Sequence, residues 1–424
     1  MATESSHQTP VGHGRDKNDP VKCEAPGFLS KVTHAGRIYG IKSFVTPMLW
    51  LRDWKEYFAP PDGAPNIIKT YECRPALPVR IFFPSGFDQT SPTLLPTVFT
   101  IHGGGFCIGH IRDDDEWNRA FADEQNVLVI ALNYSKAPGA PFPTAVHDLE
   151  ALLLAALADE SLPIDRSSRT NRPDGLSRTA LLGFSAGGNL ALSVSQLPSI
   201  RSHPHAPAAA VSIYGALDLS IPPEDKIANR PHKTSLPPPR NTDSDPLIPL
   251  APTFDWSYIP YGHNLRDPLL SPHFAPRENL PPYVCLIAAE LDMLAHESWR
   301  LASRLAHEGI EAHGGPDAAG TGRQVPDRKS KDPKWRVCGQ KQVETAALRG
   351  LGDGEDADER FAFEDTWEGG GVKWLLVPDV LHGFDNLGLR ALMGGEEAMA
   401  DAEIKTKAYM PEVGRWLKKT VWRV

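Results

Sequence analysis

The sequence is poor in cysteine, and its cysteines are not paired along the chain. Only five occur in 424 residues, and none forms the C-x-x-C spacing of a zinc knuckle or redox motif. This pattern excludes a disulfide-stapled scaffold and favours free thiols in a reducing compartment, with no metal site. The five are Cys23, Cys73, Cys107, Cys285 and Cys338.

Long hydrophobic runs are also lacking. The longest are residues 44–51, which Pro47 interrupts, and residues 151–158. Both are far shorter than the roughly 20 apolar residues that a membrane-spanning helix needs. Residues 1–22 are polar throughout and contain no apolar core of signal-peptide length. We therefore expect no membrane span and a cytoplasmic location.

The chain also lacks an excess of basic residues. It has 44 Lys and Arg against 53 Asp and Glu, which gives a net charge of −9. An acidic balance argues against nucleic acid, and against an anionic lipid surface, as a partner. Hydrophobic residues make up 41% of the chain, a proportion typical of globular proteins rather than disordered ones.

What the sequence does contain, from residue 79 onward, is an alternation of strand-like and helix-like segments. Short continuous apolar runs are typical of strands buried on both faces of a parallel sheet. Their alternation with helices predicts an α/β architecture, with a mostly parallel central sheet flanked by helices. The expected strands are residues 79–83, 97–101, 127–132, 179–183, 209–214, 284–288 and 373–377; the expected helices are 115–124, 145–158, 186–196, 297–307 and 397–419.

Composition divides the chain into three parts. Residues 1–26 predict a flexible tail, and residues 27–78 predict one or two short helices kinked at a proline. Residues 79–424 form the main α/β domain. Within it, the proline-rich segment 221–265 predicts neither regular helix nor central strand. The charged segment 314–371 is expected to be a flexible surface insertion, which also offers a surface for a homodimer or another partner.

Residues 183–187 read Gly-Phe-Ser-Ala-Gly, a G-x-S-x-G motif. An expected strand precedes the motif and an expected helix follows it, so Ser185 lies at a sharp turn between the two. This context is typical of a nucleophile elbow, in which small flanking residues let the backbone turn tightly. The alternative is a glycine-rich turn in which Ser185 only caps the helix.

A second glycine-rich motif, HGGGF at residues 102–106, directly follows an expected strand. Successive glycines leave backbone N–H groups unshielded, as the oxyanion of an acyl-transfer intermediate requires. The N–H groups of Gly103, Gly104 and Ala186 are the candidate oxyanion hole. The alternatives are a flexible glycine turn and a phosphate-binding loop, but the motif lacks the spacing that phosphate-binding loops use. The residues expected to hold this loop in shape are His102 and Gly105.

A serine nucleophile needs a basic histidine, and the histidine needs a carboxylate to orient it. Both are expected after Ser185 in the chain and at the carboxyl ends of strands. Asp292 is the favoured acid, and Glu290 is its competitor or an anchor for the loop. His382, in a short loop after the last expected strand, is the favoured base. Asp218 is a third choice of acid, and Asp379 and Asp385 are expected to be surface or loop-capping residues.

These motifs resemble the hormone-sensitive-lipase-like branch of the α/β-hydrolase superfamily. The resemblance covers residues 79–313 and 372–420, and its signature blocks are HGGGF and GFSAGG. Residues 133–138, which contain Tyr134, are similar to the tyrosine block of that family, and residues 290–294 to its acid block. The resemblance implies serine-dependent hydrolysis of carboxylic esters without a metal or organic cofactor.

The implied function is a serine carboxylesterase that acts on short- to medium-chain acyl or small-metabolite esters through an acyl-enzyme intermediate. The same residues would serve a deacetylase, a lactonase or an acyltransferase. A non-catalytic ligand receptor on the same fold is the alternative of a different class. The resemblance also implies a cap, formed by residues 27–78 and 221–265. We expect aromatic side chains of these segments to line the acyl pocket, among them Trp50, Trp54 and Trp256.

Overall fold

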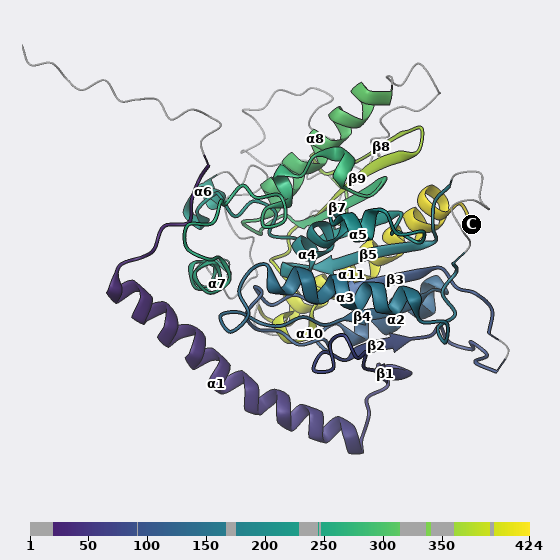
Figure 1. Ribbon diagram of the computed structural model, residues 1–424, viewed down its shortest axis with the longest axis horizontal. Helices are drawn as coiled ribbons and strands as arrows, with labels where there is room; N and C mark the ends of the chain where they lie inside the picture. The colour runs from purple at the N-terminus through teal and green to yellow at the C-terminus, as the bar shows by residue number, and fades with distance from the viewer. Residues whose placement is uncertain are drawn as a thin grey trace, which may run out of the picture.

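The structure is a computed structural model with a single central sheet (Figure 1). Within the described residues the sheet has nine strands, and six neighbouring strands in its middle run parallel. This arrangement confirms the predicted α/β architecture. The structure describes residues 20–90, 92–166, 175–228, 245, 247–313, 336–340, 360–390 and 394–424.

All seven expected strands are present, and two edge strands were not expected. The strand order is β1-β2-β4-β3-β5-β6-β7-β9-β8, with antiparallel pairing at both edges. Strands β3 to β7 are buried along their whole length, which explains why they read as continuous apolar runs. The bounds are β1 Ile67–Lys69, β2 Val79–Phe82, β3 Thr97–Ile101, β4 Leu128–Leu132, β5 Thr179–Phe184, β6 Ala209–Ile213, β7 Tyr283–Ala289, β8 Ala362–Trp367 and β9 Gly370–Val377.

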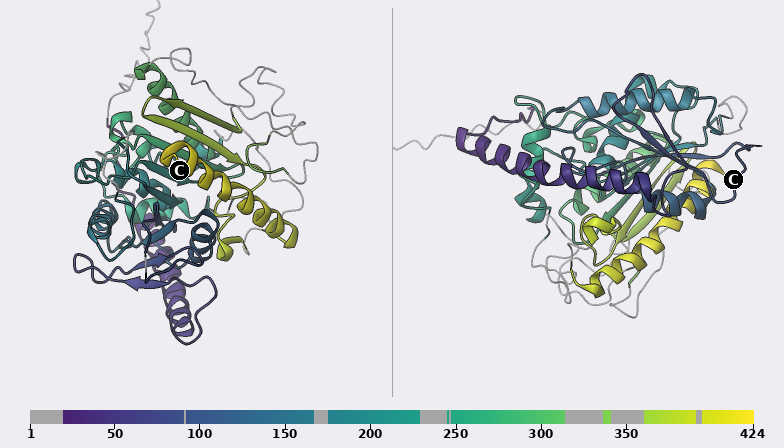
Figure 2. Two further views of the ribbon diagram at one scale, coloured as in Figure 1. Left: turned by 90° about the vertical axis from the view of Figure 1, so that its right-hand side faces the viewer. Right: turned by 90° about the horizontal axis from the view of Figure 1, so that it is seen from below.

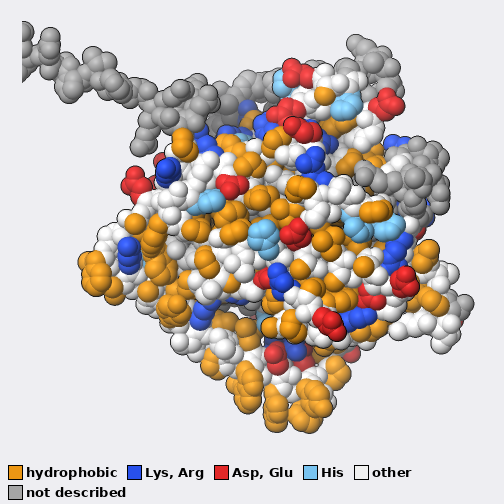
Figure 3. Space-filling view, in the orientation of Figure 1, with side chains coloured by type: hydrophobic (Ala, Val, Ile, Leu, Met, Phe, Trp, Pro, Cys, Tyr) orange, Lys and Arg blue, Asp and Glu red, His pale blue; other side chains and the backbone are white. Residues whose placement is uncertain are grey.

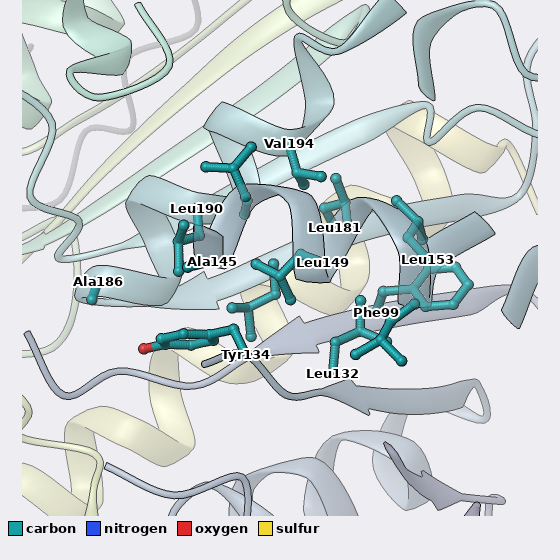
Figure 4. Close-up of a cluster of buried hydrophobic side chains, with 14 of the residues drawn as sticks. Phe99, Leu132, Tyr134, Ala145, Leu149, Leu153, Leu181, Ala186, Leu190 and Val194 are labelled. Atoms are coloured by element: carbon teal, nitrogen blue, oxygen red, sulfur yellow. The ribbon is translucent and has the colours of Figure 1, made fainter. Parts of the chain in front are cut away.

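Helices cover both faces of the sheet (Figure 2). On the first face, Leu149 and Leu153 of one helix and Leu190 of the next meet Leu181 of β5 in a buried cluster (Figure 4). The helices on this face are α3 (Thr144–Ala158), α4 (Ala186–Ser195) and α8 (Ala295–His313); those on the other are α2 (Asp115–Gln125) and α11 (Glu396–Trp416), which continues into η6 (Leu417–Trp422). The remaining helical segments are α1 (Phe28–Phe58), α5 (Pro198–Arg201), α6 (Pro223–Ala228), α7 (Ala251–Tyr258), η1 (Pro272–Phe274), η2 (Arg277–Asn279) and α10 (Leu387–Arg390).

The N-terminal part of the chain differs from the expectation. Residues 28–58 form one continuous helix, α1, with Pro47 inside it, rather than short kinked helices. Side-chain contacts hold the helix on both sides of the proline: His34 bonds Thr253 at 3.1 Å, and Arg52 bonds Asp113 at 2.9 Å. Tertiary contacts of this kind outweigh the local cost of proline.

Parts of two segments that were expected to be flexible also pair with the body of the protein. In the expected tail, the backbone N–H of Cys23 donates to His263 O at 2.9 Å; residues 1–19 lie outside the described residues. In the expected insertion, residues 362–367 form β8 as a hairpin with β9, and residues 336–340 are described as well. Averaged composition over 314–371 concealed this short edge strand, because its few apolar residues flank two adjacent acids, Glu364 and Asp365.

Candidate active site

Ser185 lies at the turn between β5 and α4 and has an unusual backbone conformation. Its φ is +54° and its ψ is −117°, a combination that costs energy for a residue with a side chain. Glycine at positions 183 and 187 makes the turn possible, because a Cβ atom at either would lie 2.0 Å from a backbone carbonyl oxygen. The turn therefore holds the hydroxyl of Ser185 at the carboxyl edge of the sheet.

The structure brings Ser185, His382 and Asp292 into one hydrogen-bonded line. His382 Nδ1 lies 2.7 Å from Asp292 Oδ2, and His382 Nε2 lies 2.7 Å from Ser185 Oγ. Because a carboxylate only accepts hydrogen bonds, Nδ1 carries the ring hydrogen and Nε2 of the neutral ring accepts from the hydroxyl. Three residues chosen from strand ends far apart in the sequence thus form the geometry of a nucleophile, a base and an orienting acid.

The surroundings of His382 raise the pKa of its imidazole. Burial lowers this pKa. The Asp292 carboxylate raises it, with smaller contributions from Asp245 and Asp385, and the net result is a pKa above that of an ordinary histidine. Asp245, which sequence reasoning missed, accepts from the backbone N–H of Met293 at 3.2 Å. Burial and the neighbouring Asp292 raise the pKa of Asp245 to about 6.

The glycine loop 102–106 lies beside the serine, and a Cβ atom at Gly103 would lie 3.2 Å from the Cβ of Ser185. Gly104 has φ of +107°, and a Cβ atom there would lie 2.1 Å from Ile108 O, so only glycine fits. The ring of His102 donates from Nδ1 to Gly103 O at 2.8 Å, and the Tyr134 hydroxyl donates to the same oxygen at 3.1 Å. His102 and Tyr134 therefore hold the glycine loop in place through the carbonyl oxygen of Gly103.

A buried lysine lies under this loop and was noticed in the sequence only as part of the tyrosine block. Lys136 Nζ donates to His102 Nε2 at 3.0 Å and to Asn133 Oδ1 at 3.2 Å. Burial and the nearby Lys136 lower the pKa of His102 well below its usual range, so the histidine is neutral. Burial also lowers the pKa of Lys136, to about 7.

Glu290, the alternative acid, is directed away from the histidine. Its Oε2 accepts from the backbone N–H of Asp379 at 2.9 Å and from Arg336 Nη2 at 3.0 Å. Arg336 also pairs with Asp379 Oδ2 at 2.6 Å, and the Arg336 side chain is fully buried. These contacts join the loop before His382 to the loop after β7 through Glu290. No sequence signal indicated Arg336, which lies in a charged run.

The other acids considered from sequence lie elsewhere. Asp218 caps a local turn through Ser220, and Arg300 Nη1 lies 3.8 Å from its Oδ2. Asp385 was expected to be a surface or loop-capping residue; it is buried, where it accepts from the hydroxyls of Tyr214 and Tyr409. Trp117 Nε1 donates to Tyr409 at 2.8 Å. This network supports the histidine loop from the side of α11.

Two cavities meet at Ser185. The larger, about 370 Å³, is mainly apolar and is lined by His382, Leu389 and the α1 residues Val45 and Leu49. The smaller, about 40 Å³, is lined by Ala186, Leu219, Met293, Lys226 and other residues of the chain. Phe254 of α7 lines both. Trp50 and Trp54 of α1 were expected to line the acyl pocket. They are instead 65% and 60% exposed.

Within the part of the chain that the structure describes, no three His, Cys, Asp or Glu residues gather in a way that would hold a metal ion. In the same part, no helix is both long and apolar enough to cross a membrane.

Comparison with known proteins places the chain in a family. The sequence pattern of the α/β-hydrolase fold matches residues 98–314. The chain is 30% identical over 259 residues to an ethyl acetate hydrolase of Pseudomonas putida, covering 59% of this chain and 72% of that protein. It is 32% identical over 162 residues to an arylacetamide deacetylase of Oryctolagus cuniculus, covering 37% of each.

Solved structures agree with the fold. An esterase of Pyrobaculum calidifontis matches with a TM-score of 0.54 at 19% identity, covering 84% of this chain and 86% of that one. Among the curated relatives, the matched region spans from 37% to 72% of their length. The chain belongs to the α/β-hydrolase fold family, in its hormone-sensitive-lipase-like branch.

Proposed function

We propose that the protein hydrolyses carboxylic esters through an acyl-enzyme on Ser185. The observation that carries this proposal is the pair of 2.7 Å contacts that join Ser185, His382 and Asp292. His382 removes the proton of the hydroxyl as its oxygen attacks the ester carbonyl, and Asp292 stabilises the imidazolium that forms. The same geometry argues against a non-catalytic receptor, which would have no need of a histidine aligned on the serine.

The remaining steps use the glycine loop and the same histidine. The backbone N–H groups of Gly103, Gly104 and Ala186 stabilise the oxyanion of the tetrahedral intermediate. His382 then gives its proton to the departing alcohol, which leaves an acyl group on Ser185. A water molecule, activated by His382, attacks the acyl carbonyl and releases the carboxylic acid.

Each half of the ester is proposed to occupy one of the two cavities. The alcohol oxygen must lie within reach of His382 to receive its proton, and His382 lines the larger cavity. The acyl chain then occupies the smaller cavity, beside Ala186. A volume of about 40 Å³ holds on the order of three water-sized groups. The preferred substrates are therefore short acyl esters, acetates above all, of apolar alcohols that fill the larger cavity.

An acyl series of p-nitrophenyl esters tests this assignment. We expect kcat/KM to be highest for the acetate and to fall at least about tenfold by the hexanoate, because longer chains do not fit the small cavity. Leu219→Ala enlarges that cavity and should move the optimum to a longer chain. Leu389→Ala, on the larger cavity, is the matched control and should leave the acyl optimum unchanged. A hexanoate optimum in the wild type would assign the cavities the other way round.

Amide deacetylation is a second candidate, because the small cavity suits an acetyl group and relatives are named arylacetamide deacetylases. Comparing kcat/KM for p-nitrophenyl acetate with that for p-nitroacetanilide distinguishes the two activities. We expect the ester to be the better substrate.

The pH dependence of kcat/KM should report the raised pKa of His382. The base must be neutral, so activity rises with pH, and the midpoint of that rise should lie above the ordinary histidine pKa of about 6.5. Asp245→Asn removes a negative charge that raises this pKa, so the midpoint should move to lower pH. Glu403→Gln, which changes an exposed acid on α11, should not move it. A midpoint that ignores Asp245→Asn would contradict this electrostatic account.

A further inference from the structure

Helix α1 has one face on the protein and a second face that the rest of the described chain leaves largely exposed. The inward stripe consists of Ile38, which is fully buried, and of Val45 and Leu49, which line the larger cavity. The spacings of seven and then four residues place all three on one side of the helix. The opposite side of the helix, which runs along the outside of the molecule, carries large apolar side chains (Figures 1 and 3). We call this set the α1 outer face: Leu29, Val32, Tyr39, Phe44, Trp50, Leu51, Trp54, Tyr57 and Phe58.

The α1 outer face is too apolar for a surface that only meets water. Its side chains are between 52% and 82% exposed. They are spread along a helix of 31 residues, which is about 46 Å long. Contiguous exposed patches of this kind mark contact with another protein or with a membrane. Two tryptophans and two tyrosines are included, and these rings favour the boundary between water and lipid, where one side of the ring is wet.

Charge distinguishes between those two partners. The helix has five Lys and Arg and two Asp and Glu, hence a net charge of 5 − 2 = +3 in a chain of net −9. Both acids of α1 pair inward with Arg112: Asp53 in direct contact, and Glu56 at 3.0 Å. Arg37 and Lys55 are exposed on the flanks of the α1 outer face. The charge of the whole chain, which argued against anionic lipid, conceals this local excess.

We propose that the α1 outer face docks on an anionic lipid surface, with the helix lying in the plane of the interface. An apolar face with aromatic rings and flanking cations is the composition of interfacial helices. A second copy of the chain fits less well, because a symmetric pair would bring two helices of the same positive charge together. The inward side of the same helix lines the larger cavity, so docking brings that cavity close to apolar esters dissolved in the lipid.

Vesicle flotation tests the docking directly, with phosphatidylcholine vesicles that contain or lack phosphatidylserine. We expect the wild type to float with the phosphatidylserine vesicles. Trp50→Ser/Trp54→Ser should lower the partition coefficient at least about tenfold, because the rings no longer bury apolar surface. Arg37→Glu/Lys55→Glu should also lower it at least about tenfold, since each cation near anionic lipid strengthens binding and each new acid is repelled.

The matched control is Ile68→Ser/Leu94→Ser, which removes two apolar side chains of similar exposure, 57% and 61%, outside α1. It should float like the wild type. Failure of the wild type to float, or equal flotation of the wild type and the Trp50→Ser/Trp54→Ser variant, overturns the proposal. If the wild type does not float but forms a dimer, and Trp50→Ser/Trp54→Ser dissociates that dimer, the α1 outer face binds a second copy of the chain instead. Hydrolysis of water-soluble p-nitrophenyl acetate should be the same in all variants, which separates this proposal from the proposed activity.

Discussion

Ser185→Ala leaves a folded protein whose kcat/KM for p-nitrophenyl acetate is lower by about 10⁴-fold or more. The expected loss is this large because, in the proposed mechanism, His382 and Asp292 act only through the hydroxyl of Ser185, and neither can contribute once that hydroxyl is removed. Steady-state hydrolysis measures the loss. The fold should persist, because Ser185 lies at the start of α4 without a side-chain cap bond to the helix backbone.

Labelling separates loss of the nucleophile from loss of structure. A fluorophosphonate should label the wild type at Ser185 and leave the alanine variant unlabelled, while circular dichroism shows the same helix content for both. Ser193→Ala is a matched control, since Ser193 is a buried serine of the same helix that bonds Asn189 at 3.1 Å. Near-normal turnover by Ser185→Ala would show that another residue is the nucleophile.

Arg336→Met should lower the free energy of unfolding by about 3–5 kcal/mol, the largest stability effect that we expect. The change leaves the carboxylates of Glu290 and Asp379 facing each other in the interior without the guanidinium that now lies 3.0 Å and 2.6 Å from them. Denaturant unfolding measures the difference, as a shift of the midpoint at an unchanged slope.

Removing the charges as well should restore most of that stability. The triple variant Arg336→Met/Glu290→Gln/Asp379→Asn keeps an acceptor for the backbone N–H of residue 379 and leaves no buried charge. Arg415→Met, which breaks a half-exposed surface pair with Glu412, should cost less than about 1 kcal/mol. If the single and triple variants unfold alike, the loss comes from packing of the Arg336 side chain rather than from the charge.

Local patterns predicted most of the sheet and the residues that gather at Ser185. The G-x-S-x-G motif and the HGGG motif are short, and each depends on neighbouring residues whose backbone must turn tightly. His382 could be chosen because parallel strands end at one edge of the sheet. Spacing alone did not decide between Glu290 and Asp292, which lie two residues apart.

What the sequence did not reveal depends on contacts between distant residues. Arg336 is one base among several in a charged run, and only folding brings it against Glu290, 46 residues away. Asp245 lies in the proline-rich stretch and reaches Met293 only in the folded chain. The position of Trp54 was predicted inward because an amphipathic pattern does not say which side of a helix faces the protein when both sides carry apolar residues.

The hydrogen bonds around Asp385 also set an order of events during synthesis. The loop that carries His382 is supported by Tyr409 of α11, and Tyr409 is in turn bound by Trp117 of α2, 292 residues earlier. Chains fold from the N-terminal side as they leave the ribosome. Most of the sheet, with the serine and the glycine loop, can therefore assemble on a nascent chain before its base is held in place. The growing polypeptide is thus expected to stay inactive toward esters until residue 409 has emerged.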